Sequence, residues 1–153
     1  MGVSGCGKTS VGEALALKLN GTFVDGDDLH SEQNKAKMAS GTALNDDDRW
    51  PWLSEVGNTL KNQNNVIVAC SALKRVYREK IKEIEPETKF VHLHGTRELL
   101  QKRMNSRSDH FMPIALLDSQ LATLELITAD ENGKQFDISK SVSQLVDEII
   151  AWL

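Results

Sequence analysis

Short apolar runs alternate along the chain with longer segments in which apolar residues recur every three to four positions, a pattern that predicts strands separated by amphipathic helices. In the predicted helix Ser10–Leu19, the side chains of Val11, Leu15 and Leu19 share one face. The uninterrupted apolar run Val66–Cys70 is typical of a strand that is buried on both faces of a parallel sheet.

The same pattern predicts the remaining elements. We expect strands over Thr22–Asp25, Phe90–Leu93 and Phe136–Ile138, and helices over Glu32–Ser40, Leu53–Gln63, Lys74–Ile84, Arg97–Ser106, Ile114–Glu125 and from Ser141 to the C-terminus. This alternation predicts an α/β fold with a parallel sheet and helices on both faces, and 153 residues predict a single domain over 1–153. Ligands of such sheets bind at the carboxyl ends of the strands, so the polar residues that follow the strands are the candidates for a site.

Composition narrows the functional classes. The hydrophobic content of 40% excludes a disordered chain, and the net charge of -4 argues against binding to nucleic acid or to an anionic membrane surface. We find no signal peptide and no apolar run of the roughly 20 residues that span a bilayer. Two cysteines, Cys6 and Cys70, form no disulfide framework, so we expect a cytoplasmic protein. Base rates are compatible with a homodimer.

A phosphate-binding loop, or P-loop, stands at the start of the chain. Its pattern, G-x-x-x-x-G-K-[ST], is matched by Gly2, Val3, Ser4, Gly5, Cys6, Gly7, Lys8 and Thr9. The glycines allow backbone N–H groups to converge on phosphate oxygens, the Lys8 ammonium would neutralise the phosphates, and the Thr9 hydroxyl would bind Mg²⁺. A glycine-rich turn that caps a helix is the structural alternative.

The electropositive surroundings of the P-loop also predict that the thiol of Cys6 is more reactive than that of Cys70. The alternative is that both thiols are buried and inert.

A P-loop normally follows a strand, but only Met1 precedes this one. We therefore expect the first and central strand of the sheet to be missing, leaving a slot with unpaired backbone groups. The sequence is either incomplete at its N-terminus, which the intact downstream motifs favour, or the product of a shortened gene model.

An acidic turn follows the predicted strand Thr22–Asp25. Asp25 and Asp27, spaced i and i+2 at the end of a strand, point the same way. One carboxylate can orient Mg²⁺ or its water, and the other can accept a proton from a substrate hydroxyl. A solvated turn is the alternative, and the P-loop favours the functional interpretation.

Four segments together resemble the gluconokinases, and the resemblance extends over nearly the whole chain. They are Gly2–Thr9, Asp25–His30 (DGDDLH), Leu44–Leu53 (LNDDDRWPWL) and Cys70–Arg75 (CSALKR). The resemblance implies phosphorylation of D-gluconate to 6-phospho-D-gluconate by ATP with Mg²⁺. It also implies a three-layer P-loop kinase fold with a short lid, similar to shikimate and nucleoside monophosphate kinases.

The resemblance also implies roles for single residues. Asp27 matches the acceptor of the substrate hydroxyl proton, and Asp25 matches the carboxylate nearer the metal. Arg103 and Arg107 fall where the lid helix of such kinases supplies arginines to the transferring phosphoryl group, and the lid itself is expected at about 105–118. Their i, i+4 spacing places both on one helix face, as it would two surface arginines.

A sugar acid also needs a cation for its carboxylate. The candidates are Arg49, Lys74, Arg75 and Arg78, although Arg49 follows three aspartates with which it could pair instead. His30 could donate a hydrogen bond to a substrate hydroxyl or cap a local turn.

Two alternatives remain open. One is another small P-loop metabolite kinase, similar to adenylylsulfate or shikimate kinase, against which the CSALKR and LNDDDR segments argue. The other is a nucleotide-binding protein in which the absence of the first strand has impaired catalysis.

Overall fold

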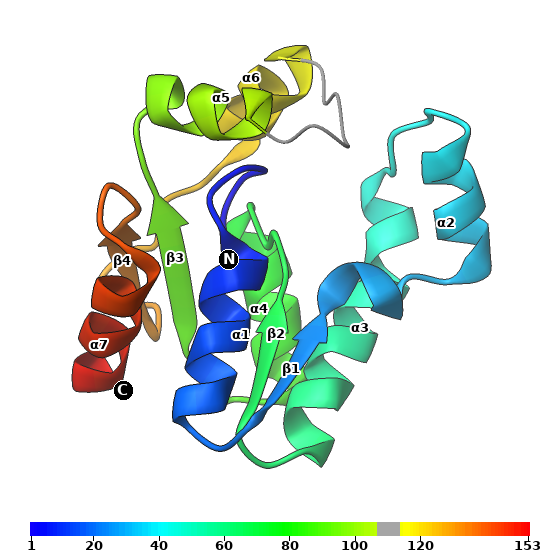
Figure 1. Cartoon of the computed structure of the whole chain (residues 1–153). Coiled ribbons are helices and arrows are strands. Elements are labelled where there is room, and N and C mark those ends of the chain that lie inside the picture. Colours follow the sequence, from blue (N-terminus) through cyan, green and yellow to red (C-terminus); the bar gives the residue numbers. More distant parts are fainter. Residues whose placement is uncertain (107–113) are drawn as a thin grey trace.

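Short parallel strands alternate with helices, as the hydrophobic pattern predicts. The computed structural model describes residues 1–106 and 114–153 (Figure 1). The helices are α1 (Lys8–Lys18), α2 (Glu32–Ala39), α3 (Asp46–Asn62), α4 (Arg75–Ile84), α5 (Arg97–Asn105), α6 (Ile114–Thr123) and α7 (Val142–Trp152). The strands are β1 (Thr22–Asp25), β2 (Val66–Ala69), β3 (Phe90–His94) and β4 (Gly133–Asp137), and a short 3₁₀ helix, η1 (Gly26–Leu29), follows β1.

The strands form two parallel pairs instead of one continuous sheet. β1 pairs with β2, with Asp25 opposite Ala69, and β3 pairs with β4, with Phe90 opposite Gly133. Within the described residues, no strand-to-strand ladder joins β2 to β3. Between the two pairs lie Met1 and Gly2, which share backbone hydrogen bonds with Leu93 and Ser71 respectively.

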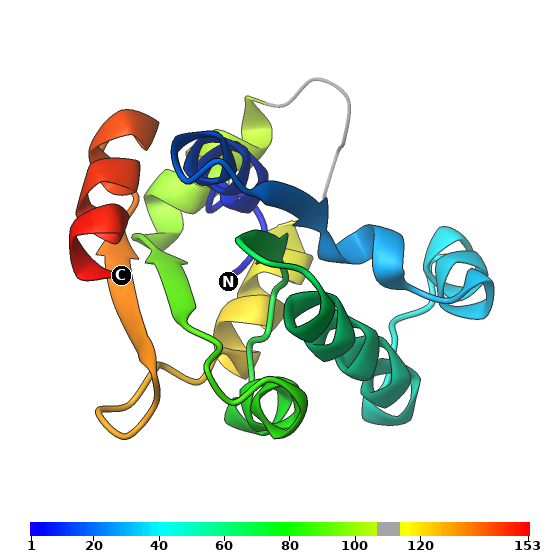
Figure 2. The same cartoon turned by 90° about the horizontal axis from the view of Figure 1, so that it is seen from below.

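Helices cover both faces of the strands and complete the predicted three layers (Figure 2). α1 packs against α7 and over β1 and β2, while α3 packs against α4 on the opposite face. Two hydrophobic clusters follow this division. The first includes Leu15, Leu93, Phe136 and Ile149, and the second includes Trp52, Val56, Tyr77 and Ile81.

The contact between α1 and β1 is unusually close. Gly12 of α1 faces the ring of Phe23, and a Cβ atom at position 12 would lie 2.6 Å from Phe23 Cε2. Real Cβ atoms do not approach a ring so closely, so the absence of a side chain at Gly12 sets how near α1 lies to the strand.

The start of α3 differs from the prediction. The helix begins at Asp46 instead of Leu53 and continues through Pro51. A capping box fixes its N-terminus: the Asn45 side chain accepts from Asp48 N–H at 2.9 Å, and the Asp48 carboxylate accepts from Asn45 N–H at 2.8 Å. The sequence signal for this cap, Asn45 three residues before an acidic residue, was available but was not used.

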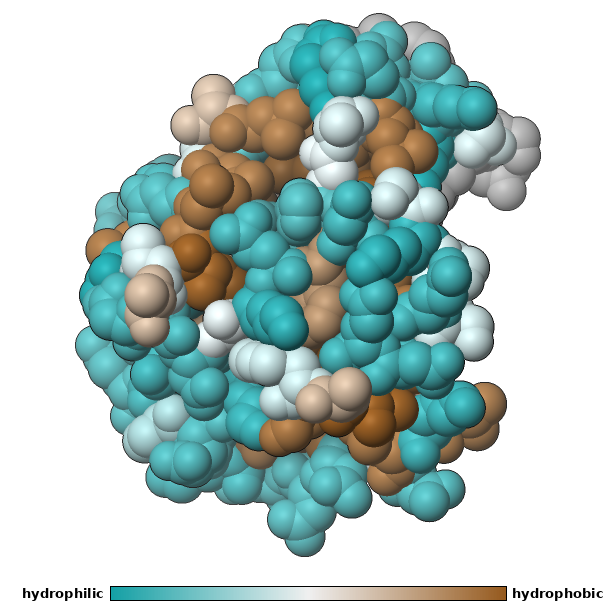
Figure 3. Space-filling model, turned by 90° about the vertical axis from the view of Figure 1, so that its left-hand side faces the viewer, coloured by the Kyte–Doolittle hydropathy of each residue, from teal (hydrophilic) through white to brown (hydrophobic). Residues whose placement is uncertain are grey.

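The side of the molecule that carries α7 and β4 is mostly hydrophilic, interrupted by separate hydrophobic patches (Figure 3). α7 itself exposes Val142 and Ile150. Over the described ranges, none of the helices combines the length and the apolar character that crossing a bilayer requires.

Candidate functional site

The P-loop, Gly2–Thr9, connects the gap between the strand pairs to α1 and lies below α5 and α6 in Figure 1. Gly5 and Gly7 have φ angles of 80° and 93°, the left-handed region that glycine adopts without strain. Gly7 is the N-cap of α1, and no side chain caps the helix there. The first amides of α1, at the positive end of the helix, are therefore left for an anion, which fits a phosphate group.

The polar side chains of the loop are arranged around these amides. Lys8 Nζ donates to the carbonyl oxygens of Gly2 and Val3, both at 3.1 Å, and Thr9 is exposed at the start of α1. The Ser4 N–H donates to Oε1 of Gln120 at 2.7 Å. An acceptor oxygen from α6 thus binds a loop amide. Sequence reasoning assigned no role to Gln120, because this contact joins residues that lie far apart in the chain.

The acidic turn lies at the carboxyl end of β1. Asp25 Oδ1 accepts from Asp27 N–H at 3.1 Å and so shapes the turn, while the Asp27 side chain is exposed. Trp52 Nε1 donates to the Gly26 carbonyl at 2.6 Å, and the Trp52 ring stacks on His30 at 4.3 Å. Trp52 therefore fixes the position of the turn through its contacts with Gly26 and His30.

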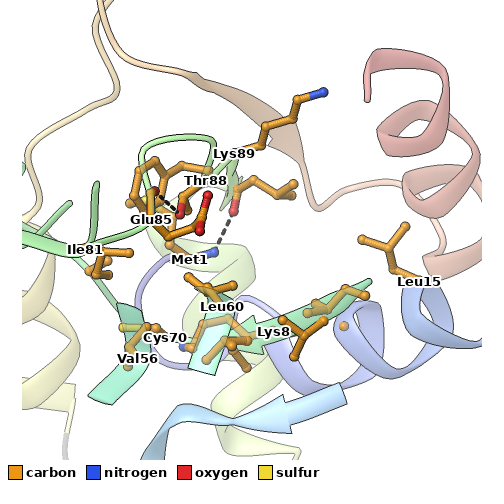
Figure 4. A pocket seen from close by; sticks show the side chains of 18 of the residues that line it. Met1, Lys8, Leu15, Val56, Leu60, Cys70, Ile81, Glu85, Thr88 and Lys89 are labelled. Atoms are coloured by element: carbon orange, nitrogen blue, oxygen red, sulfur yellow. Dashed lines mark hydrogen bonds between the residues drawn. The ribbon is translucent and has the colours of Figure 1, made fainter. Parts of the chain in front are cut away.

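The loop and the acidic turn share one edge of the molecule. Lys8 and Asp27 both act electrostatically on Cys70, which directly follows β2 and lines the same pocket as Lys8 (Figure 4), and burial raises the pKa of this thiol to about 11.

Burial also lowers the pKa of His30, whose Nδ1 lies 3.4 Å from the Asn34 amide nitrogen. Cys6 is 0% exposed and Cys70 is also buried, and this burial favours the alternative of two inert thiols over a more reactive Cys6.

Two of the cations proposed for a carboxylate surround Asp46 at the start of α3. Lys74 Nζ lies 3.0 Å and Arg49 Nη1 lies 3.5 Å from this carboxylate, to which Tyr77 also donates at 2.5 Å. The hydrogen bonds from Tyr77 and Lys74 lower the pKa of Asp46. Both cations also lie over the ring of Tyr77, at 5.2 Å for Lys74 and 5.8 Å for Arg49. The cluster keeps one net positive charge.

Arg78 does not fit the expected contact with substrate. Its side chain is 1% exposed and forms a bidentate ion pair with Glu131 at 2.5 and 2.8 Å. Its remaining donors bind backbone carbonyl oxygens of Ala72, Leu73 and Glu125. In this structure Arg78 has a structural role, because the nitrogens of its guanidinium donate to acceptors of the protein itself.

Arg75, the other α4 candidate, is exposed and pairs with Glu79 and Asp130.

Of the two arginines expected in the lid, Arg103 on α5 donates to the Ile138 carbonyl at 2.5 Å. A Cβ atom at Gly7 would lie 3.6 Å from Arg103 Nη1, so this guanidinium lies against the P-loop. Arg107 and the other residues from 108 to 113, half of the predicted lid in all, lie outside the described residues.

Comparisons with known proteins agree with this geometry. A model of the shikimate kinase family matches residues 4–152. A probable gluconokinase from Xenopus tropicalis is 45% identical, over 97% of this chain and 88% of that protein. This chain belongs to the gluconokinase family. The crystal structure of a gluconokinase from Sinorhizobium meliloti 1021 superposes with a TM-score of 0.88 at 44% identity, covering 99% of this chain and 87% of that one.

A more distant structure shows the extent of the fold. The APS kinase CysC of Mycobacterium tuberculosis, at 17% identity, superposes with a TM-score of 0.68 over 99% of this chain and 92% of that one. The predicted P-loop kinase fold is thus confirmed. As a gluconokinase-family member, the chain is a phosphotransferase that uses a nucleotide.

The buried ion pair of Arg78 leads to a stability prediction. Arg78→Met leaves the Glu131 carboxylate buried without its partner, which should lower the free energy of unfolding by about 3–5 kcal/mol. The thermal midpoint should fall by roughly 10 °C or more. Arg75→Met, which removes two exposed ion pairs from the same helix, is the matched control and should change the midpoint little. A raised KM for the sugar acid at an unchanged midpoint would instead place Arg78 in the substrate site.

Proposed function

We propose that this chain transfers the γ-phosphoryl group of ATP to a hydroxyl of D-gluconate and forms 6-phospho-D-gluconate. The observation that carries the proposal is the P-loop and the Asp25–Asp27 turn at one edge of a gluconokinase-family chain. Two buried free cysteines are compatible with action in the cytoplasm.

The P-loop side would hold the phosphates. The uncapped amides of α1 and the Lys8 ammonium bind phosphate oxygens, and Arg103, which lies against Gly7, adds positive charge to the transferring group. Arg107 remains proposed for the same role. The Thr9 hydroxyl and the Asp25 carboxylate would hold Mg²⁺, whose charge neutralises the phosphates when it is bound.

The acceptor side would bind gluconate. Asp27 accepts the proton of the attacking hydroxyl as its oxygen bonds to phosphorus and ADP leaves. His30, which stacks on Trp52 beside this turn, would form a hydrogen bond with a substrate hydroxyl. Lys74 and Arg49, with their net positive charge around Asp46, would bind the substrate carboxylate.

A coupled assay of ADP formation tests the proposed reaction. The purified chain should phosphorylate gluconate in preference to other aldonates, shikimate and adenylylsulfate. Lys8→Met should lose about 10²- to 10³-fold in kcat, because the ammonium that meets the phosphates is gone, while its circular dichroism spectrum stays unchanged. Equal turnover of shikimate or adenylylsulfate would support one of the rival kinases, and nucleotide binding without turnover would support an impaired enzyme.

Asp27→Asn separates chemistry from binding. The amide has nearly the same shape but cannot accept the hydroxyl proton, so kcat should fall by about 10²-fold with a smaller change in KM for ATP. Asp28→Asn, on the same exposed turn, is the matched control and should keep a kcat close to that of the unmodified chain. Equal effects of the two substitutions would reduce Asp27 to a residue of the turn.

The carboxylate site is tested at Lys74. Lys74→Met should raise KM for gluconate about tenfold or more, since a hydrogen bond from a charged donor is lost, with little change in KM for ATP. Lys80→Met removes an ion pair with Glu83 from the neighbouring helix α4 and should leave both constants unchanged. The assignment fails if Lys74→Met behaves like this control.

A further inference from the structure

The imidazole ring of His30, which directly follows η1, is held from two sides. One face of the ring stacks on Trp52, with the ring centroids 4.3 Å apart and the two planes inclined by 14°. Its Nδ1 faces the side-chain amide of Asn34 on α2, at 3.4 Å from Nδ2. His30 and Asn34 are both buried, with exposed fractions of 7% and 6%. The stack therefore fixes the plane of the ring, and the contact with Asn34 fixes its direction.

A second contact decides which end of the Asn34 amide faces the ring. Nδ2 of Asn34 donates to the backbone carbonyl oxygen of Asp48 in α3 at 2.8 Å. A carbonyl oxygen only accepts hydrogen bonds, so the amino end of the amide must face Asp48. The same NH2 group has a second hydrogen, and His30 Nδ1 lies within its reach. Asn34 therefore offers a donor to the imidazole.

A donor at Nδ1 determines which ring nitrogen of His30 carries the proton. Nδ1 must accept with its lone pair, so the hydrogen of the neutral ring is on Nε2. A doubly protonated ring would direct an N–H at the NH2 group of Asn34, which disfavours the charged form. Burial acts in the same direction and lowers the pKa of His30. Of the charged groups around the ring, Arg49 on α3 and Lys35 on α2 also lower this pKa, while Asp27 raises it.

The other ring nitrogen of His30 reaches solvent. Within the part of the chain that the structure describes, the one buried side-chain nitrogen or oxygen without a hydrogen-bond partner is His92 Nδ1. His30 Nε2 has no partner among the same residues, so it is not a fully buried atom. The backbone N–H of His30 donates to the Asp27 carbonyl at 3.3 Å, which keeps the ring next to the acidic turn. A buried ring thus offers a single N–H to a ligand at this turn.

We propose that Asn34 is a positioning residue that holds His30 in its Nε2–H form, so that the imidazole donates to a substrate hydroxyl and takes no proton from it. This inference rests on the proposed function, in which the sugar acid lies beside the acidic turn. A neutral ring with its proton on Nε2 has no lone pair at that atom, so His30 does not compete with Asp27 for the proton of the attacking hydroxyl. The two neighbouring groups then have separate roles, Asp27 as the base and His30 as a donor.

The tautomer is measured directly and without substrate. Imidazole proton–nitrogen correlation spectra of the isotopically labelled chain at about pH 8 should show His30 protonated at Nε2 and unprotonated at Nδ1. The loss of these signals in His30→Gln identifies them. Asn34→Asp replaces the donor by an acceptor of the same shape, so the proton should move to Nδ1 and the pKa of His30 should rise above the ordinary value of about 6.5.

The KM for gluconate should follow the proton on Nε2. In Asn34→Asp the ring is doubly protonated at about pH 6 and still donates from Nε2, whereas at about pH 9 the neutral ring presents a lone pair there. The KM of the variant divided by that of the unmodified chain should therefore be close to one at the lower pH and rise about fivefold or more at the higher pH. The same ratio for ATP should not change with pH. Gln33→Glu adds an equal charge to an exposed position of α2 and is the matched control, for which both ratios should stay flat.

Three results would overturn the proposal: a proton on Nδ1 of His30 in the unmodified chain, a tautomer that Asn34→Asp leaves unchanged, or a KM ratio for gluconate that does not vary with pH. The first result needs no variant at Asn34, so the proposal can fail even where Asn34→Asp folds poorly. Absence of gluconate turnover in the unmodified chain overturns the proposed function and with it the role of His30 toward substrate. The spectra still show in that case whether Asn34 fixes the tautomer.

Discussion

The backbone hydrogen bonds of Met1 and Gly2 connect the two strand pairs, β1–β2 and β3–β4, which are not bonded directly to each other in the described part of the chain. Met1 bonds to β3 through Val91 and Leu93, and Gly2 bonds to Ser71 beyond β2. The P-loop begins at this dipeptide, so the position of every phosphate-binding amide depends on it.

The rest of the site is built by groups that fix backbone rather than by catalytic side chains. Trp52 holds the Gly26 carbonyl and stacks on His30, which keeps the acidic turn in place. Arg78 binds three carbonyl oxygens and Glu131, and so ties the loop after β2 to the segment that precedes β4. Exposed groups such as Asp27 then project from a rigid support.

Sequence reasoning succeeded for elements with a clear apolar period or a short motif, but it missed the local cap at Asn45 that starts α3. The period of apolar residues predicted the strands and helices, and the P-loop and the acidic turn were found from short motifs. For Arg78 the sequence held no sign of its contacts in the fold, because a basic residue in a motif-rich segment shows the same signal whether its acceptors are a substrate or, as the structure has them, Glu131 and distant carbonyl oxygens. The contact of Ser4 with Gln120 was equally invisible, since only the fold brings α6 to the loop.

The closeness of α1 to β1 has a consequence for the enzyme as a whole. α1 carries the P-loop at its N-terminus, and β1 carries the acidic turn at its carboxyl end. The separation of the two halves of the site is therefore set by the missing side chain at Gly12, which lets Phe23 lie directly against the helix. One methyl group at that buried position would push the P-loop away from the acidic turn. Position 12 thus acts as a spacer that can change the catalytic geometry while every residue of the site stays the same.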